Sequence, residues 1–220
     1  MIKYVLFDLD GTLLSTLDTI THHLNGALRS RGLGEISVDN TREYIGNGAR
    51  KLVTRAVHAG GVDDESVIND VLADYNRAYD ADPLPCTQPY EGIVLLVDRL
   101  HAEGFVLGVV TNKPEPTAKK LISHFFGDKI SVVSGGRAGI ALKPDPEESL
   151  EVLSSMGGVP RECAFVGDTS VDIYTGKNME AALSVGVTWG FRSRDELIEA
   201  GADVAVDNAE GLYNVLTEGI

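Results

Sequence analysis

Two aspartates lie two residues apart near the start of the chain, in the segment Asp8-Leu9-Asp10-Gly11-Thr12. They follow an apolar run, Tyr4-Val5-Leu6-Phe7, which is typical of a buried strand that ends at a turn glycine. Because side chains alternate along a strand, we expect both carboxylates on one face, where they repel one another. Such a pair needs a cation, a shared proton or a catalytic role; the alternative is a turn capped by two solvated aspartates.

Three further groups of chemically useful residues follow, in the order Thr111-Asn112, Lys143-Pro144 and Gly167-Asp168 with Asp172. With the first segment, they resemble the four motifs of the haloacid dehalogenase superfamily, and more narrowly those of its phosphoglycolate phosphatase branch. The resemblance spans most of the chain. It implies a Mg²⁺-dependent phosphoric monoester hydrolase, with 2-phosphoglycolate as the first candidate substrate.

The first and third motifs carry the covalent chemistry in this interpretation. Asp8 attacks the phosphorus and forms an aspartyl-phosphate, which divides one difficult displacement into two easier ones. Asp10 protonates the leaving oxygen and then deprotonates the attacking water. Thr12 is expected to fix Asp10 by a hydrogen bond, and Lys143 to hold Asp8 and neutralise charge on the phosphoryl group.

The last motif indicates a metal site. Asp168 and Asp172 follow the apolar run Cys163-Ala164-Phe165-Val166 and lie four residues apart at a helix start, so they project from one side of its first turn. With Asp8 they form an oxygen-rich cluster suited to Mg²⁺. The resemblance implies that the ligands are the side chains of Asp8 and Asp168 and the backbone carbonyl of Asp10, with Asp172 outside the ligand set or acting through water. The alternative is a surface helix capped by Asp168.

Two groups of residues are candidates for substrate binding. Thr111-Asn112 ends a strand-like segment before a helix, where a hydroxyl and backbone N–H groups can bind phosphate oxygens. The next residue, Lys113, is expected to face solvent. Gly48 and Arg50 lie in residues 45–52, a loop that resembles the glycine-bearing cap loop of phosphoglycolate phosphatases, and Arg50 would pair with a substrate carboxylate. The alternative is a plain connector between helices.

Short apolar segments alternate with helical patterns over most of the chain, which predicts an α/β fold with a doubly wound parallel sheet, a Rossmann-like core. The strand-like segments are 2–7, 105–110, 130–133, 163–166, 182–185 and 204–206. The helix-like segments include 92–102, 116–125, 147–156 and 194–200. Such sheets bind ligands beyond the carboxyl ends of their strands, and each motif follows a strand, so we expect a single active site there.

One stretch breaks this alternation. Residues 15–82 contain helical spacing without a convincing strand, and a loop with three prolines follows at 83–89. We therefore predict an all-helical cap domain at 15–82, inserted into a catalytic core of 1–14 and 83–220. The resemblance implies that this cap closes over the active site.

Composition narrows the function classes. The 220-residue chain has a net charge of -14, which argues against nucleic acid or an anionic membrane as the main partner. A phosphate substrate must therefore be attracted by a local positive site. Cys86 and Cys163 are far apart in sequence, no leader pattern precedes the first strand, and no apolar stretch has the length of a membrane span. We expect a cytoplasmic monomer or homodimer that acts on a small phosphorylated metabolite.

Other functions remain open at this stage. A capped pyrophosphatase, nucleotidase or hexose-phosphate mutase would share the motifs, whereas a non-catalytic binding protein should have lost a motif residue and this chain has lost none. A haloacid dehalogenase would not need the Mg²⁺ cluster. Two positions depart from the phosphoglycolate phosphatase pattern: Ser15 stands where an aspartate is common, and Arg137 stands where an acidic residue commonly follows two glycines.

Overall fold

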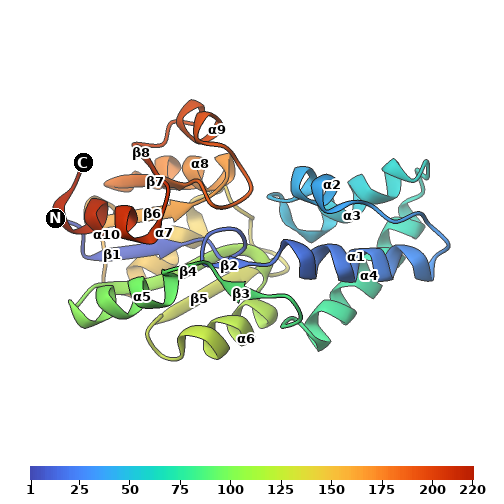
Figure 1. The fold of residues 1–220 in the computed structure, drawn as a ribbon, viewed down its shortest axis with the longest axis horizontal. Coiled ribbons are helices and arrows are strands. Elements are labelled where there is room, and N and C mark those ends of the chain that lie inside the picture. The colour runs from blue at the N-terminus through green and yellow to red at the C-terminus, as the bar shows by residue number, and fades with distance from the viewer. The chain divides into compact units, whose positions relative to one another are not determined.

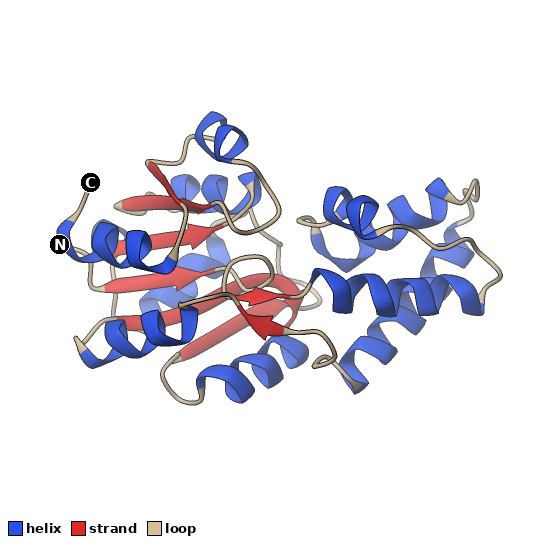
Figure 2. Ribbon diagram, viewed as in Figure 1, coloured by secondary structure: helices blue, strands red, loops and turns tan.

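The computed structural model describes residues 1–220 and divides the chain into two compact units. The core unit contains Met1–Ser15 and Pro89–Ile220, and the helical unit contains Thr16–Gln88. Figures 1 and 2 show strands only in the core unit and in the two short connections between the units. The predicted α/β fold, a parallel sheet with an all-helical insertion, is confirmed.

The core unit contains a six-stranded sheet in the order β5-β4-β1-β6-β7-β8, in which every neighbouring pair is parallel. Its strands are β1 (Tyr4–Phe7), β4 (Val106–Pro114), β5 (Val132–Gly136), β6 (Cys163–Gly167), β7 (Leu183–Val187) and β8 (Val204–Val206). The first strand pairs on both edges, with Tyr4 opposite Val106 on one side and Cys163 on the other. A strand enclosed in this way must be apolar throughout, which explains its composition.

Helices cover both faces of the sheet. The helices of the core unit are α5 (Ile93–Ala102), α6 (Glu115–Phe126), α7 (Glu147–Ser155), α8 (Ser170–Asn178), α9 (Arg194–Glu199) and α10 (Ala209–Glu218). Val5 and Phe7 of β1 point into a cluster formed with α5, α6 and α10. Leu6 points into the opposite cluster, to which α7 contributes. The alternation along β1 therefore supplies both faces of one sheet.

The fourth strand extends beyond its predicted end. It was expected over 105–110, but β4 continues to Pro114 and stays paired with β5. The glycines of β5 allow this, because a Cβ at Gly135 would lie 2.6 Å from the Lys113 carbonyl oxygen. The extension places Thr111 and Lys113 on one side of the strand, where both are buried.

The helical unit consists of α1 (Leu17–Ser30), α2 (Val38–Tyr44), α3 (Gly48–Ala59) and α4 (Glu65–Ala81). Leu24 and Leu28 of α1 pack with Val53 and Val57 of α3 and Val71 of α4 in a separate hydrophobic cluster. At the two chain crossings, β2 (Leu14–Ser15) pairs with β3 (Gln88–Pro89).

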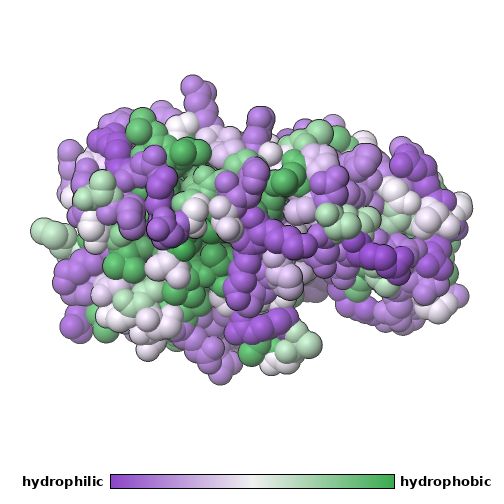
Figure 3. Space-filling model, turned by 90° about the horizontal axis from the view of Figure 1, so that it is seen from below, coloured by the Kyte–Doolittle hydropathy of each residue, from purple (hydrophilic) through white to green (hydrophobic).

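Exposed apolar side chains are distributed unevenly over the two units. Most of the large exposed hydrophobic residues belong to the core unit, with Leu95 at 63% exposure. In Figure 3 green, hydrophobic atoms gather on the core unit at the left, whereas the helical unit is mostly purple. None of the helices has both the length and the apolar character that a bilayer span requires.

Candidate active site

A buried lysine bridges two of the predicted aspartates. Lys143, in the loop before α7, donates hydrogen bonds from Nζ to Asp8 Oδ1 at 2.7 Å and to Asp172 Oδ1 at 2.6 Å. Asp8 follows β1, and Asp172 lies in the first turn of α8. All three side chains are buried. The ammonium group thus fixes the Asp8 carboxylate beyond the carboxyl end of the sheet.

Burial and charge act in opposite directions in this triplet. Burial raises the pKa of Asp8 to about 6, while the Lys143 charge opposes that rise and the Asp172 charge adds to it. Burial alone would lower the pKa of Lys143, but the charges and hydrogen bonds of Asp172 and Asp8 outweigh it and raise that pKa above its usual value. Lys143 therefore stays protonated over the physiological range.

Asp168 is held by one side chain and one backbone group. Thr12 Oγ1 donates to Asp168 Oδ1 at 2.9 Å, and the Phe191 N–H donates to Asp168 Oδ2 at 2.8 Å. Burial, followed by the charges of Asp172 and Asp8, raises the pKa of Asp168 well above its ordinary value. A buried carboxylate with this much negative charge around it favours a cation beside it.

Two glycines make room for Asp168. A Cβ at Gly11 would lie 2.3 Å from Asp168 Oδ2, and a Cβ at Gly190 would lie 2.3 Å from Asp168 Cβ. Gly11 also has a φ of 92°, a left-handed conformation that side chains disfavour. The backbone therefore closes around this carboxylate on two sides.

Asp10 has a different lysine partner, which the sequence did not predict. Lys113 was expected to face solvent, but it is buried and donates from Nζ to both oxygens of Asp10, at 2.9 and 3.2 Å. The extended β4 explains the difference, because Lys113 shares the buried side of the strand with Thr111. The expected bond from Thr12 to Asp10 is also absent, since the turn at Gly11 directs Thr12 to Asp168.

The aspartate cluster has the composition of a divalent cation site. One carboxylate oxygen each from Asp8, Asp168 and Asp172 lies within 4.8 Å of the others. With Asp10, four aspartates face the two buried lysines, so an excess of two negative charges remains, which matches one divalent ion. Asp172 already accepts hydrogen bonds on both oxygens, from Lys143 and from the backbone and side chain of Thr169.

The second motif supports the lysine loop. Asn112 Oδ1 accepts from the Lys143 backbone N–H at 2.9 Å, and Asn112 Nδ2 donates to the Lys143 carbonyl at 3.2 Å. The Thr111 hydroxyl accepts from the Lys113 backbone N–H at 3.2 Å. Asn112 thus positions Lys143, and phosphate binding by Thr111-Asn112 stays a prediction.

The predicted residues of the helical unit have partners inside that unit. Gly48 begins α3 with a φ of 83°. Arg50 donates to Asn69 Oδ1 at 2.9 Å and forms an ion pair with Glu65. Their contact with substrate stays a prediction.

Sequence reasoning missed two contributors after β7. Trp189 is half-buried against the core cluster, and its Nε1 also donates to the Thr12 carbonyl at 3.0 Å. The Phe191 N–H that binds Asp168 is a backbone group, so no residue type could have revealed it.

A doubly wound parallel sheet with lysine-bridged, buried aspartates beyond its strands defines an α/β enzyme with an aspartate-based active site. Over residues 5–185 the sequence matches the haloacid dehalogenase-like hydrolase family, and the chain belongs to that family. The sequence-based prediction of the superfamily is confirmed.

Relatives of known name cover nearly the whole chain. The phosphoglycolate phosphatase of Rhodospirillum rubrum is 34% identical over 218 residues, which are 96% of this chain and 90% of that protein. The phosphoglycolate phosphatase of Haemophilus influenzae is 30% identical and aligns over 97% of this chain and 98% of its own. A crystal structure of a predicted phosphoglycolate phosphatase from Haemophilus somnus has a TM-score of 0.89 and 26% identity, and covers 100% of this chain and 98% of that one. The predicted enzyme class, a phosphoric monoester hydrolase, is confirmed.

Proposed function

We propose that the protein is a Mg²⁺-dependent phosphatase of small phosphate monoesters, with 2-phosphoglycolate as the first candidate. The observation that carries the proposal is the bridge from Lys143 to Asp8 and Asp172, with Asp168 beside it. The names of the relatives support the choice of substrate. We further propose that it acts in the cytoplasm as a monomer or homodimer.

Asp8 is the proposed nucleophile. Its Oδ1 accepts from Lys143, while its Oδ2 has no hydrogen bond within the protein and is available for attack. A bond forms from this carboxylate to phosphorus as the ester P–O bond breaks, and the leaving oxygen takes a proton from Asp10. Asp10 then accepts a proton from water, which attacks the aspartyl-phosphate, releases inorganic phosphate and regenerates Asp8.

The donor set fits Mg²⁺, because it consists of carboxylate and carbonyl oxygens. We propose that the side chains of Asp8 and Asp168 and the backbone carbonyl of Asp10 hold the ion. Asp172 would then remain with Lys143 and Thr169, its partners in the structure. When bound, the ion neutralises charge on the phosphoryl group and helps to orient it.

Arg50 is the proposed recognition residue for a substrate carboxylate. Both side chains of its ion pair with Glu65 are more than half exposed, so replacing Glu65 by a substrate carboxylate costs little free energy. Arg50→Ala should raise KM for 2-phosphoglycolate by about one to two orders of magnitude, and should leave p-nitrophenyl phosphate hydrolysis unchanged. Equal effects on both substrates would remove Arg50 from substrate recognition.

The decisive experiment combines a substrate screen with removal of the nucleophile. Initial rates on 2-phosphoglycolate, pyrophosphate, nucleotides and β-glucose 1-phosphate should favour 2-phosphoglycolate, and EDTA should stop the reaction until Mg²⁺ is restored. Asp8→Asn should lower kcat by about a thousandfold or more, whereas Asp128→Asn, an exposed aspartate of the same unit, should not. Near-normal turnover by Asp8→Asn, or activity without metal, would contradict the mechanism.

A further inference from the structure

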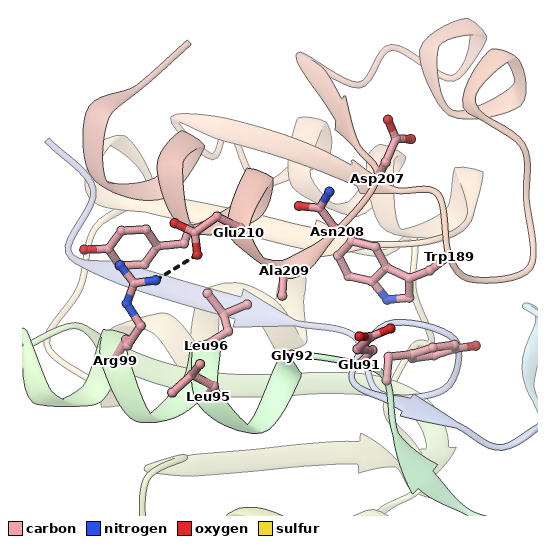
Figure 4. Close-up of a pocket in the computed structure, with 12 residues that line it drawn as sticks. Glu91, Gly92, Leu95, Leu96, Arg99, Trp189, Asp207, Asn208, Ala209 and Glu210 are labelled. Atoms are coloured by element: carbon pink, nitrogen blue, oxygen red, sulfur yellow. Dashed lines mark hydrogen bonds and ion pairs between the residues drawn. The ribbon is translucent and has the colours of Figure 1, made fainter.

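A cavity whose lining includes none of the clustered aspartates lies in the core unit (Figure 4). Its volume is about 490 Å³, which is within the range of small-molecule sites. Its walls come from three segments: residues 90–99 at the start of α5, Trp189 after β7, and residues 207–213 from the end of β8 into α10. The proposed phosphatase chemistry uses none of the helix residues that line it.

The body of the cavity is apolar and aromatic. The rings of Tyr90 and Trp189 lie 6.5 Å apart between centroids, at an angle of 55°. Leu96 is buried in the cavity lining, whereas Leu95 is 63% exposed. Such walls suit the apolar part of an organic ligand, since they remove its surface from water.

The charges around the cavity disfavour an anion. Arg99 is the one cationic side chain in the lining, and it is already occupied: its guanidinium lies 3.6 Å from the centroid of the Tyr213 ring and donates to Glu210 at 2.8 Å. Glu91 and Asp207 also line the cavity. Arg99 and Arg194 balance two of the three carboxylates, so the third leaves a negative local charge in a chain of net charge -14.

Of the three carboxylates, Glu91 is the one that remains able to form an ion pair with a ligand. Asp207 accepts from Thr188 at 2.6 Å and pairs with Arg194 at 2.8 Å, whereas Glu91 has no ion-pair partner. Figure 4 shows Glu91 at the Trp189 end of the cavity and the Arg99–Glu210 pair at the other end. A carboxylate without an ion-pair partner at the same end of a cavity as an indole ring is an arrangement that attracts a cation.

We propose that this cavity is a binding site for an organic cation with an apolar or aromatic body, such as an arylalkylamine. The ammonium group pairs with Glu91 near Trp189, and the apolar body packs against Tyr90 and Leu96. No bond is made or broken. The proposal does not depend on the substrate of the phosphatase.

Hydrogen bonds couple this cavity to the loop after β1, which contains Thr12 and Leu13. Trp189 Nε1 donates to the Thr12 carbonyl at 3.0 Å, and Thr12 Oγ1 donates to Asp168 at 2.9 Å. On the other wall, the Tyr90 N–H donates to the Leu13 carbonyl at 3.2 Å. A cation that shifts either ring therefore acts on the loop that holds Asp168. By reciprocity, binding of Mg²⁺ must change the affinity for the amine by the same factor.

The chain contains a single tryptophan, and it lines the cavity, so changes at this site can be followed by its emission. The full-length protein is titrated with 2-phenylethylamine, and separately with phenylacetate, which has a similar body and the opposite charge. The amine should change Trp189 emission saturably, and phenylacetate should not. An equal response to both probes, or a response to neither, would overturn the proposal.

Two variants test the position and the charge of the site. Glu91→Gln should weaken amine binding by about two- to fivefold. Leu95→Lys, which adds a positive charge to the lining, should weaken it by about twofold or more. The matched control is Ile198→Lys, because Ile198 is also an exposed helix residue of the core unit but lies outside the cavity. A control that weakens binding as much as Leu95→Lys would overturn the assignment.

Two further measurements address coupling and an alternative occupant. The dissociation constant of the amine is measured from Trp189 emission with and without Mg²⁺, and should differ by about fivefold or more. Identical values would overturn the coupling. Sedimentation of wild type and Leu95→Lys then examines self-association. A dimer that dissociates in Leu95→Lys, together with no response of Trp189 to the amine, would overturn the proposal in favour of a second copy of the chain.

Discussion

Asp8 is a destabilising residue in the metal-free protein, because its carboxylate is buried. Its pKa is raised from 3.8 to about 6, mainly by burial. The folded protein therefore binds this proton more tightly than the unfolded chain, and ionisation of Asp8 reduces stability as the pH rises from 3.8 through about 6. Residues that bind charged ligands commonly lower the stability of the folded protein in this way.

The first prediction follows from this sign. In EDTA at about pH 8, Asp8→Asn should increase the free energy of unfolding by about 1–3 kcal/mol, because the amide has no charge to bury. Lys143 keeps Asp172 as a partner in the variant. Urea denaturation as a function of pH measures the effect, and the gain should disappear below about pH 4. A variant less stable than wild type at about pH 8 would show that the hydrogen bond from Lys143 stabilises the protein by more than burial of the Asp8 charge destabilises it.

Lys113 is a positioning residue for Asp10, since it holds both oxygens of that carboxylate. In Lys113→Met, we expect single-turnover release of an alkyl leaving group from 2-phosphoglycolate to slow by about tenfold or more. Release of p-nitrophenolate should slow less, because that leaving group departs without a proton. Lys119→Met is the control, since Lys119 is exposed and pairs with Glu115 on its own helix. Equal slowing for both substrates would refute the positioning role.

At the scale of elements, the approach of the loop after β7 to the loop after β1 shapes the proposed metal site. Gly190→Ala would place a Cβ 2.4 Å from Asp168 Oδ2, so the carboxylate must move. We expect the Mg²⁺ concentration for half-maximal activity to rise by about tenfold or more.

The matched control for that prediction is Gly26→Ala. Gly26 lies within α1, and an added Cβ there meets no atom within 4 Å. This substitution should leave the Mg²⁺ requirement unchanged and increase stability by about 0.4–1 kcal/mol, because alanine loses less entropy in a helix. A Gly190→Ala enzyme with an unchanged Mg²⁺ requirement would show that Asp168 adapts freely.

Elements with a clear apolar pattern could be predicted from the sequence, and those without one could not. The apolar strand β1 and the helix α5 were expected almost at their observed limits. Only the start of α8 was expected, at Asp168 and Asp172. The helix has no apolar stripe that would reveal its extent, because it contacts the sheet through Gly176, next to Phe165 and Ser184. The strands β2 and β3 have two residues each, too few to show a period.

The residues of the site were predictable, but not all of their partners were. Motif order identified Asp8, Lys143 and Asp168, whose side chains the structure brings together. The left-handed turn at Gly11 determines where the Thr12 side chain points, and the length of β4 determines where the Lys113 side chain points. Their hydrogen-bond partners depend on these two features. Local sequence contains no information on such contacts across more than a hundred residues.

At the scale of the whole molecule, net charge opposes the proposed substrate. With a net charge of -14, the protein repels a phosphate dianion until that ion reaches the buried lysines. Raising the ionic strength from about 0.01 to 0.15 M shortens the screening length from about 30 to 8 Å, so kcat/KM for 2-phosphoglycolate should rise. Initial rates in KCl at saturating Mg²⁺ measure this. A decrease in kcat/KM would show that attraction by the local lysines dominates the approach.

The place of β1 at the centre of the sheet determines the order in which the two units can form as the chain is synthesised. The first strand emerges first, yet its two neighbours, β4 and β6, begin at Val106 and Cys163. The helical unit is one continuous segment and can complete its hydrophobic cluster before either neighbour exists. The apolar β1 must therefore wait as an unpaired strand until β4 has been made, about halfway along the chain, and it is paired on both edges only after β6. This makes it the segment most exposed to aggregation and to chaperone binding in a nascent chain.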